Sequence, residues 1–393
     1  MTPERLAALR TPEGVKALAT AAELAGGDPL TAAAALRASG MPADLAAAAL
    51  TQADLRRRAA GKFGADADLM FFTRTGLEQA TRSAVAGRRA ARLRAAGVRA
   101  LADLGCGVGA DSIAAARAGI RVYALEADPG TAAVAAANAE VLGLDGISVI
   151  QGDAETFQLP EVDAVFCDPA RRRNGRRVFD PAAYSPSWDF VASLHERVPR
   201  TVLKLAPGVD HALVPPGAEA EWVSVRGEVV EAAFWCGPLA EVPRRATLVG
   251  VADLTGTGEA KAPVGTLGRY LYEPDGAVVR SHLVAEFAAT VDGHLADPQI
   301  AYVYADAPAP TPYARCIEIE EALPFSLKRL RALLRDRGVG RLEILKRGSA
   351  LEPEKLRRDL RLSGPAAATL VLTRVAGAPT ALIGSPTSGT TST

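Results

Sequence analysis

The chain has 393 residues, of which 49% are hydrophobic, and its 45 Lys and Arg residues balance 45 Asp and Glu residues. This length exceeds that of a single core and predicts two to four domains, whereas the balanced charge neither favours nor excludes a nucleic-acid partner. Four scattered cysteines without C-x-x-C spacing exclude a disulfide framework and a cysteine zinc site, a pattern typical of a reducing cytoplasm. We find no signal-peptide pattern and no uninterrupted apolar stretch of about 20 residues, so no membrane span is expected.

Residues 1–65 are rich in Ala and Leu, with glycine-containing breaks at 26–29 and 40–42. This pattern predicts about four short helices packed as a small bundle. A cap that docks substrate or forms a dimer is one interpretation, and a purely stabilising extension is the other. Residues 71–81 come next and lead into a helix that we expect to end near residue 95.

A strand, a glycine turn, a helix and a second strand are predicted between residues 99 and 126. An apolar run ends in Asp103 and Leu104 and continues as Gly-Cys-Gly-Val-Gly; an Ala-rich stretch and a second apolar run, closed by Glu126, follow. This is the order of a parallel βαβ unit. The glycines let a ligand approach the backbone, the helix N-terminus attracts it, and Glu126 is placed to accept hydrogen bonds from ribose hydroxyls. The segment therefore predicts a site for a nucleoside cofactor.

The segment Asp103–Gly109 resembles motif I of class I S-adenosylmethionine-dependent methyltransferases. In the same family an acidic residue ends the next strand, as Glu126 does here. The alternative is a nicotinamide or flavin domain, because Gly105, Gly107 and Ala110 also fit the pattern G-x-G-x-x-G/A. The residues that follow the later strands have to distinguish the two.

The strand predicted at 162–167 ends in Asp168-Pro169-Ala170-Arg171. This loop resembles the Asp/Asn-Pro-Pro-aromatic loop of methyltransferases that act on exocyclic amines or amides. In such a loop the side-chain oxygen and a neighbouring backbone carbonyl accept the two N–H bonds and turn the nitrogen lone pair toward the methyl group. Asp168 and Pro169 keep this amine-binding half, whereas Ala170 and Arg171 replace the pair that stacks on a base. The loop disfavours a dehydrogenase, in which it has no purpose.

Asp153 and Lys204 are two further candidates near strand ends. Asp153 follows the strand 147–150 and stands where the methyltransferases accept a hydrogen bond from the adenine amine; a turn or N-cap role is the alternative. Lys204 lies within the predicted strand 201–205, where a buried lysine is costly unless it reaches a carboxylate or the pocket. We expect it to point toward Asp168 or the substrate, with a snorkelling side chain as the alternative.

Five arginines fall within residues 171–177, at the rim of the predicted site. Such a run recognises phosphate groups, and a solvated loop is an equally good interpretation. Phe179, Tyr184 and Trp188 follow it and are candidates for aromatic walls of the same pocket.

Two further strands, 221–224 and 229–235, complete a predicted sheet of seven strands with an antiparallel edge over about residues 80–245. Residues 253–267 read as a linker. A small α/β unit with a helix at 278–289 is expected to follow.

Strands and helices alternate between residues 314 and 373. Residues 328–361 carry twelve Lys and Arg against five Asp and Glu. A basic α/β module of this order resembles THUMP-like domains, whose relatives bind structured RNA. Residues 385–393 are expected to be disordered.

Together these features resemble the bacterial THUMP-like-domain methyltransferase family. The resemblance implies an α/β fold with a Rossmann-like seven-stranded class I methyltransferase sheet, an N-terminal helical bundle and a C-terminal ferredoxin-like or THUMP-like α/β module. The expected divisions are a helical domain 1–65, a methyltransferase domain 66–245, a ferredoxin-like unit 265–311, a THUMP-like domain 312–384 and a tail 385–393.

The same resemblance implies which residues bind and react. The residues expected to bind S-adenosylmethionine are Asp103, Gly105, Cys106, Gly107, Gly109, Glu126, Ala127, Asp153, Ala154 and Asp168. Those expected to take part in methyl transfer are Asp168, Pro169 and Lys204, and those expected to bind substrate are Arg171, Arg172, Arg173, Arg176, Tyr184 and Trp188. In this family the segment before the first strand often folds over the methionine end of the cofactor, so Phe72, Thr75 and Gln79 are weaker candidates, with helix packing as the alternative. No metal is implied, because a sulfonium is itself an activated leaving group.

Three functions remain open at this stage. The first is methyl transfer to a nitrogen of an RNA base that the C-terminal module delivers. The second is methylation of a small phosphorylated or amine metabolite, with that module as a structural lid. The third is a protein that binds the cofactor and RNA without catalysis.

Overall fold

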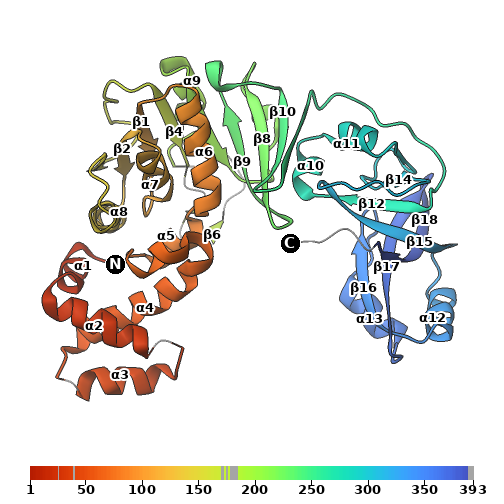
Figure 1. The fold of residues 1–393 in the computed structure, drawn as a ribbon, viewed down its shortest axis with the longest axis horizontal. Helices are drawn as coiled ribbons and strands as arrows, with labels where there is room; N and C mark the ends of the chain where they lie inside the picture. Colours follow the sequence, from red (N-terminus) through yellow and green to blue (C-terminus); the bar gives the residue numbers. More distant parts are fainter. Residues whose placement is uncertain (25, 39, 170–171, 174–175, 178–184, 388–393) are drawn as a thin grey trace. The chain divides into compact units, whose positions relative to one another are not determined.

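The computed structural model describes residues 1–387 except 25, 39, 170–171, 174–175 and 178–184 (Figure 1). The chain divides into two compact units. The N-terminal unit comprises Met1–Leu205, Pro215–Ala218 and Phe234–Ala240, and the C-terminal unit comprises Ala206–Val214, Glu219–Ala233 and Glu241–Thr393. The finer domain boundaries predicted above stay predictions.

Short helices open the N-terminal unit, as the breaks in the sequence predict. They are α1 (Pro3–Leu9), α2 (Pro12–Glu23), α3 (Pro29–Ala38) and α4 (Ala43–Phe63). Thr2 and Thr11 cap α1 and α2 by accepting hydrogen bonds from backbone N–H groups of the first turn, and each helix begins with a proline, which needs no hydrogen-bond acceptor there.

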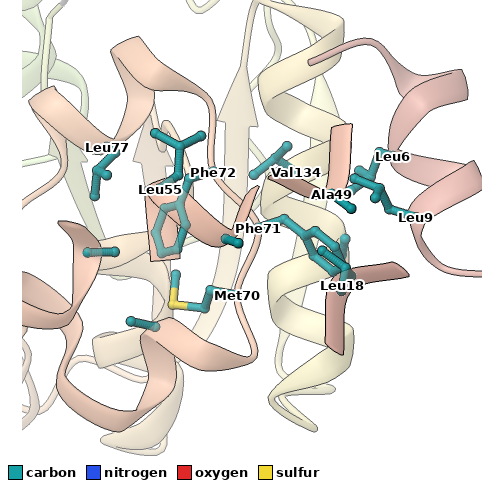
Figure 2. Packing of buried hydrophobic residues seen from close by; sticks show 14 of the residues in the cluster. Leu6, Leu9, Leu18, Ala49, Leu55, Met70, Phe71, Phe72, Leu77 and Val134 are labelled. Carbon is teal, nitrogen blue, oxygen red and sulfur yellow. The ribbon is translucent and has the colours of Figure 1, made fainter. Parts of the chain in front are cut away.

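These helices do not form a core of their own. Leu6 and Leu9 of α1 and Ala49 of α4 belong to one buried cluster with Phe71 and with Val134 of α8 (Pro129–Val141), as Figure 2 shows. The bundle and the region that follows it are therefore stabilised by the same burial of apolar surface.

Between residues 64 and 95 the helix expected to end near residue 95 is present, and two shorter helices that the sequence did not predict precede it. The elements are the short 3-10 helix η1 (Gly64–Asp68), α5 (Arg74–Gln79) and α6 (Ser83–Ala95). The backbone leaves the helical conformation at Ala80, with φ −56° and ψ 135°. The break has a physical cause, because the side chain of Lys62 binds the carbonyls at the end of α5.

A parallel sheet lies at the centre of the N-terminal unit. Its elements are β1 (Ala100–Leu104), α7 (Ala110–Arg117), β2 (Arg121–Glu126), α8, β3 (Ile147–Gln151), β4 (Ala164–Cys167), α9 (Trp188–Arg197) and β7 (Thr201–Leu205). The strands lie in the order β7-β4-β1-β2-β3, and each neighbouring pair in this series is parallel. The carboxyl ends of the strands therefore meet at one edge, which is where ligands bind to such sheets. Two short strands, β5 (Arg172–Arg173) and β6 (Arg176–Arg177), pair with each other after β4.

Strands β8 (Glu219–Val225), β9 (Glu228–Trp235), β10 (Arg244–Leu248) and β11 (Ala252–Gly256) follow, together with the 3-10 turns η3 (His211–Leu213) and η4 (Gly237–Leu239). Within the described residues the strand order reads β11-β10-β8-β9-β7-β4-β1-β2-β3, nine strands where the sequence predicts seven. The predicted linker is wrong in its first part, because Ala252–Gly256 pairs antiparallel with β10.

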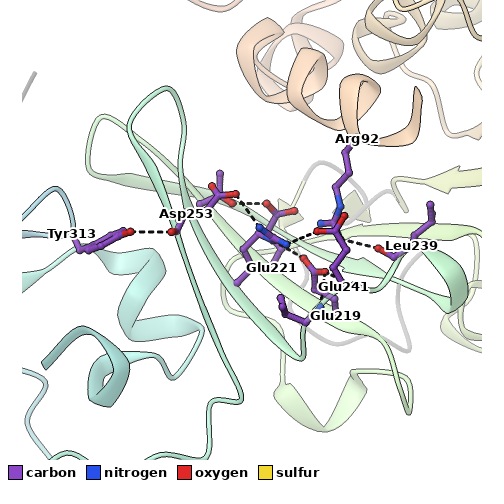
Figure 3. A network of polar contacts seen from close by, with 10 residues as sticks. Arg92, Glu219, Glu221, Leu239, Glu241, Asp253 and Tyr313 are labelled. Carbon is purple, nitrogen blue, oxygen red and sulfur yellow. Dashed lines mark hydrogen bonds and ion pairs between the residues drawn. The ribbon is translucent and has the colours of Figure 1, made fainter. Parts of the chain in front are cut away.

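A buried ion pair organises β8, β10 and β11 (Figure 3). Glu219 is fully buried and accepts a hydrogen bond of 2.8 Å from Nε of Arg245 and one from the backbone N–H of Glu241. Arg245 also pairs with the carboxylates of Glu241 and Asp253. This network satisfies a carboxylate that would otherwise be costly to bury.

The rest of the C-terminal unit is a second sheet with helices. Its elements are β12 (Tyr270–Pro274), α10 (Gly276–Arg280), α11 (Val284–Thr290), β13 (His294–Leu295), β14 (Val303–Ala305), β15 (Ala314–Pro324), α12 (Leu327–Asp336), β16 (Val339–Lys346), α13 (Pro353–Leu360), β17 (Ala366–Val375) and β18 (Ala378–Pro386). The strands lie in the order β13-β14-β12-β15-β18-β17-β16. Helices α12 and α13 pack on one face through a leucine-rich cluster, and a second cluster that includes Tyr302 and Tyr304 lies against other residues of the sheet.

The residues predicted for the ferredoxin-like unit and those predicted for the THUMP-like domain contribute strands to this one sheet, because β12 pairs with both β14 and β15. Two other expectations are corrected. The helix expected at 278–289 is interrupted between α10 and α11. The predicted disordered tail begins too early, since Ser385 and Pro386 pair with β15. Residues 388–393 lie outside the described residues. None of the described helices is long and apolar enough to cross a membrane.

Candidate active site

A cavity of about 560 Å³ lies at the edge of the parallel sheet where the strands end. Its walls come from the glycine turn after β1, the end of β2, the turns after β3 and β4, and Lys204 of β7. Met1, residues of the segment 73–81 and the pair Ser185–Pro186 also line it. The topology of the sheet explains why the residues from its five parallel strands meet here.

At Gly105 the glycine turn approaches other backbone so closely that a side chain is excluded. Gly105 has φ +87°, and a Cβ there would stand 2.9 Å from the carbonyl oxygen of Asp168. Its N–H and that of Cys106 both donate to the carbonyl of Leu125. The turn is thus fixed to β2 on one side and lies against the β4 loop on the other.

Glu126 connects the glycine turn to the start of α8. One carboxylate oxygen accepts the N–H of Gly107 at 3.0 Å, and the other accepts the N–H of Asp128 at 3.0 Å. Its orientation at the mouth of the cavity is therefore determined by the backbone on both sides. Asp153, further along the same edge, is exposed and accepts the N–H of Glu155.

Asp103 is the most perturbed acid that lines the cavity. It is fully buried; Oδ2 accepts a hydrogen bond of 2.5 Å from Ser112, and Oδ1 has no partner among the described residues. Burial, followed by the negative charge of Asp111, raises the pKa of Asp103 to about 7, although the Ser112 hydrogen bond opposes this. An unpaired carboxylate oxygen in a cavity wall is a site that favours a cationic ligand.

Lys204 reaches the carboxylate predicted for it. Its Nζ lies 2.5 Å from Oδ2 of Asp168 and 2.9 Å from Oγ1 of Thr81. Thr81 donates in turn to Asp111 at 2.6 Å, and Asp111 forms an ion pair with Arg89. The result is a continuous chain of buried polar contacts from α6 to the β4 loop.

The charges in this chain stabilise one another. Burial raises the pKa of Asp111, but the cations Arg89 and Lys204 and the hydrogen bonds that it accepts outweigh this, so its pKa is lowered overall. Arg89 also lies over the ring of Phe166 at 4.5 Å. Asp111 is therefore held as a carboxylate in the wall of the cavity.

The structure brings together most of the residues predicted for the cofactor and for methyl transfer. Those that line the cavity are Asp103, Gly105, Cys106, Gly107, Glu126, Ala127, Asp153, Ala154, Asp168, Pro169 and Lys204. Gly109 does not line it and instead begins α7 with φ +93°. Among the weaker candidates, Thr75 and Gln79 line the cavity, whereas Phe72 is a core residue that packs on Phe63.

The predicted substrate residues are less well placed. Trp188 begins α9 and does not line the cavity. Arg171 and Tyr184 lie outside the described residues. Arg172, Arg173 and Arg176 lie on the β5–β6 hairpin, of which only the backbone is described.

Sequence reasoning missed Thr81, Asp111 and Arg89. Asp111 stands in the first turn of α7, where an acidic residue is common for helix-dipole reasons alone. Arg89 is the buried arginine of α6 in an arginine-rich helix, and its periodic position relative to Val85, Ala86 and Leu93 is the signal that could have identified it.

Known families match three stretches of the chain. Residues 101–175 match the methyltransferase domain, residues 314–386 match the THUMP domain-like family, and residues 2–59 match a domain of unknown function. Proteins from two strains of Mycobacterium tuberculosis, CDC 1551 and H37Rv, are each described as an uncharacterized S-adenosylmethionine-dependent methyltransferase. Each is 37% identical over 332 residues, which cover 82% of this chain and 90% of the relative. The chain belongs to the S-adenosylmethionine-dependent methyltransferases.

A solved structure supports the same fold over almost the whole length. A protein of Porphyromonas gingivalis W83, described as a methyltransferase on a provisional basis, superposes with a TM-score of 0.76 and 23% identity. The superposition covers 94% of this chain and 98% of that one. The methyltransferase is thus an enzyme with S-adenosylmethionine as its cofactor, a class I fold and a C-terminal THUMP-like domain. Membership of this family excludes the dehydrogenase alternative.

Proposed function

We propose that this methyltransferase transfers a methyl group to a nitrogen of an RNA base, within the cavity at the edge of the parallel sheet. The cofactor fits the residues present. Asp103 offers an unpaired carboxylate oxygen for the ammonium of the methionine part, and the glycine turn beside it lines the same cavity. Glu126 would accept from the ribose hydroxyls and Asp153 from the adenine amine.

When bound, S-adenosylmethionine supplies a sulfonium methyl group that needs no further activation. The protein must therefore bring the acceptor into line and exclude competing water. Asp168 is suited to the first task, because its side chain is only one-quarter exposed and Lys204 holds Oδ2. Oδ1 then remains for one N–H of the acceptor, and the carbonyl of Pro169 for the other. The nitrogen lone pair is left to point at the methyl group.

The basic surface of the THUMP-like domain supports RNA as the acceptor. On α12 and α13 the buried leucines pack in the leucine-rich cluster, whereas five cations on these helices and directly after α13 are exposed: Lys328, Arg329, Lys355, Arg358 and Arg361. Within the described residues none of the five has an ion-pair partner. Unpaired cations on neighbouring helices suit a phosphate backbone, because binding releases counterions. We call these five residues the basic face and propose that it docks the RNA.

A transfer assay with tritiated S-adenosylmethionine tests the proposal. The acceptor is total RNA from a strain that lacks the protein, so that the sites are unfilled; a small-molecule extract of that strain is tested in parallel. We expect label in RNA with the wild type and none with Asp168→Ala. Label in the small-molecule fraction alone would contradict the RNA acceptor. Absence of label from both fractions, with cofactor binding intact, would contradict catalysis.

The basic face is tested separately by salt dependence. Replacement of Lys355, Arg358 and Arg361 by Gln should lower the slope of log affinity for RNA against log salt by roughly 2–3, since each phosphate contact contributes about 0.7–0.9. The control replaces Arg5 and Lys16, two exposed cations of the N-terminal unit, and should leave the slope unchanged. An equal slope in both variants would show that RNA binds elsewhere.

A further inference from the structure

Side chains of the N-terminal helices hold the backbone of the segment 69–81, which we call the strap. Gln52 of α4 both donates to and accepts from the backbone of Phe72, at 2.8 and 2.9 Å. One turn later, Arg56 donates to the carbonyls of Leu69 and Met70. These polar groups lie beside the apolar cluster of Figure 2, so the strap is fixed by hydrogen bonds as well as by packing.

Lys62, in the last turn of α4, forms the tightest of these contacts. Its Nζ donates to three backbone carbonyls, those of Leu77 at 2.7 Å, Glu78 at 2.9 Å and Ala80 at 2.9 Å. Carbonyls at the end of a helix lack intrahelical partners, and a cation there also offsets the negative end of the helix dipole. Lys62 therefore ends α5 and determines where the chain goes next.

Ala80 is followed by Thr81, which lines the cavity and belongs to the chain of polar contacts described above. Thr81 accepts from Lys204 and donates to Asp111, and Lys204 in turn holds Asp168. The last carbonyl bound by Lys62, that of Ala80, directly precedes the residue whose hydroxyl contacts the amine of Lys204. A shift at the end of α5 would move that hydroxyl and loosen Lys204.

Asn138 of α8 fixes the other end of the strap to the glycine turn. Its side chain accepts from the N–H of Phe71 and donates to the carbonyls of Phe71 and Val108. The fully buried amide thus has backbone partners on both sides. The strap is held at one end by Asn138 and at the other by Lys62, with wall residues of the cavity such as Thr75 and Gln79 between them.

We propose that Lys62 is a positioning residue for the methyl-transfer site and that the helices of residues 2–59, through α4, hold the strap as a wall of the cofactor cavity. These helices then support the methyl-transfer site directly, because they provide the rigid surface to which the strap is bound. The inference rests on the proposed assignment of the cavity to the cofactor, and it is independent of the identity of the methyl acceptor.

Hydrogen exchange and calorimetry on the full chain test this role. Lys62→Met keeps the apolar stem and removes the donor, and Lys62→Arg restores a cation. The matched control is Lys16→Met, at an exposed lysine of α2. We expect Lys62→Met to exchange amides of residues 74–81 at least tenfold faster and to bind S-adenosylmethionine at least tenfold more weakly. Lys62→Arg should recover most of both, and Lys16→Met should match the wild type.

A double variant separates positioning from general loss of stability. Thr81→Val removes the hydrogen bond to Lys204 and leaves the contacts of α4 unchanged. The double variant Lys62→Met/Thr81→Val should bind the cofactor only slightly more weakly than whichever single variant has the lower affinity, because the two substitutions act along one path. Additive losses would overturn the proposal, as would a folded Lys62→Met variant with exchange and affinity within twofold of the wild type.

Two further outcomes keep the test decisive. If Lys62→Met does not fold, Lys62→Gln, which keeps a shorter donor, must show the faster exchange of residues 74–81 for the proposal to stand. If the wild type itself does not bind S-adenosylmethionine, the cofactor assignment fails, while the exchange result still reports whether Lys62 holds the strap.

Discussion

From the proposed contact with the cofactor ammonium, we expect Asp103 to make the affinity for the cofactor depend on pH. Its pKa of about 7 arises mainly from burial and means that half of the molecules carry a neutral acid at pH 7. In the proposed site the ammonium of the cofactor binds the carboxylate and not the acid, so the apparent affinity should scale with the ionised fraction. That fraction is about one-half at pH 7 and about one-hundredth at pH 5. We therefore expect binding to be roughly fifty-fold weaker at pH 5 than at pH 7.

Calorimetric titration of S-adenosylmethionine at pH 5, 6, 7 and 8 measures this directly. Asp103→Asn cannot ionise and should bind weakly at every pH, with no dependence between pH 5 and 7. The control is Asp145→Asn, at an exposed aspartate remote from the cavity lining, and should keep the wild-type profile. A wild-type affinity that is constant over this range, or a pH dependence that survives in Asp103→Asn, would refute the reasoning.

Three further changes have expected outcomes. The pKa of Asp103 is about 7 in the folded chain, against an ordinary value of 3.8, so its contribution to stability is present below about pH 4 and is lost as the pH rises through 7. Asp103→Asn should therefore raise the free energy of unfolding of the cofactor-free protein at pH 8 by up to about 4 kcal/mol, measured by urea unfolding. An unchanged unfolding midpoint would argue against the raised pKa. Gly105→Ala should cost about 1–3 kcal/mol from its positive φ alone and should also weaken cofactor binding, since its Cβ would meet the Asp168 carbonyl; wild-type affinity in this variant would contradict the close approach. Arg245→Ala leaves the buried Glu219 without its cation and should lower the free energy of unfolding by about 3–5 kcal/mol, whereas a loss below about 1 kcal/mol would show that the ion pair is not the organising contact.

Much of the cavity lining could be predicted because its residues follow strand ends. Parallel strands place their carboxyl ends at one edge, so Asp103, Glu126, Asp153 and Asp168 were expected to converge before any contact was known. The glycine spacing also predicted where the turn lies. The position of Lys204 within a predicted buried strand predicted a carboxylate partner, because burying an unpaired ammonium costs free energy.

The supporting contacts could not be predicted, because they join side chains to backbone far away in sequence. Lys62 binds carbonyls 15 to 18 residues further along, and the pattern of α4 does not mark this residue among its other cations. Strand β18 was missed for a different reason: its residues, Ala378–Pro386, include Pro, Gly and Ser, which weaken a strand signal, and only pairing with β15 and β17 orders them.

The structure of the protein with S-adenosylhomocysteine bound is the most direct test of the account. The homocysteine ammonium should lie within hydrogen-bonding distance of Oδ1 of Asp103, the ribose hydroxyls should contact Glu126, and the sulfur should face Asp168. A ligand bound outside this cavity, or inside it with its ammonium away from Asp103, would contradict the assignment of the site.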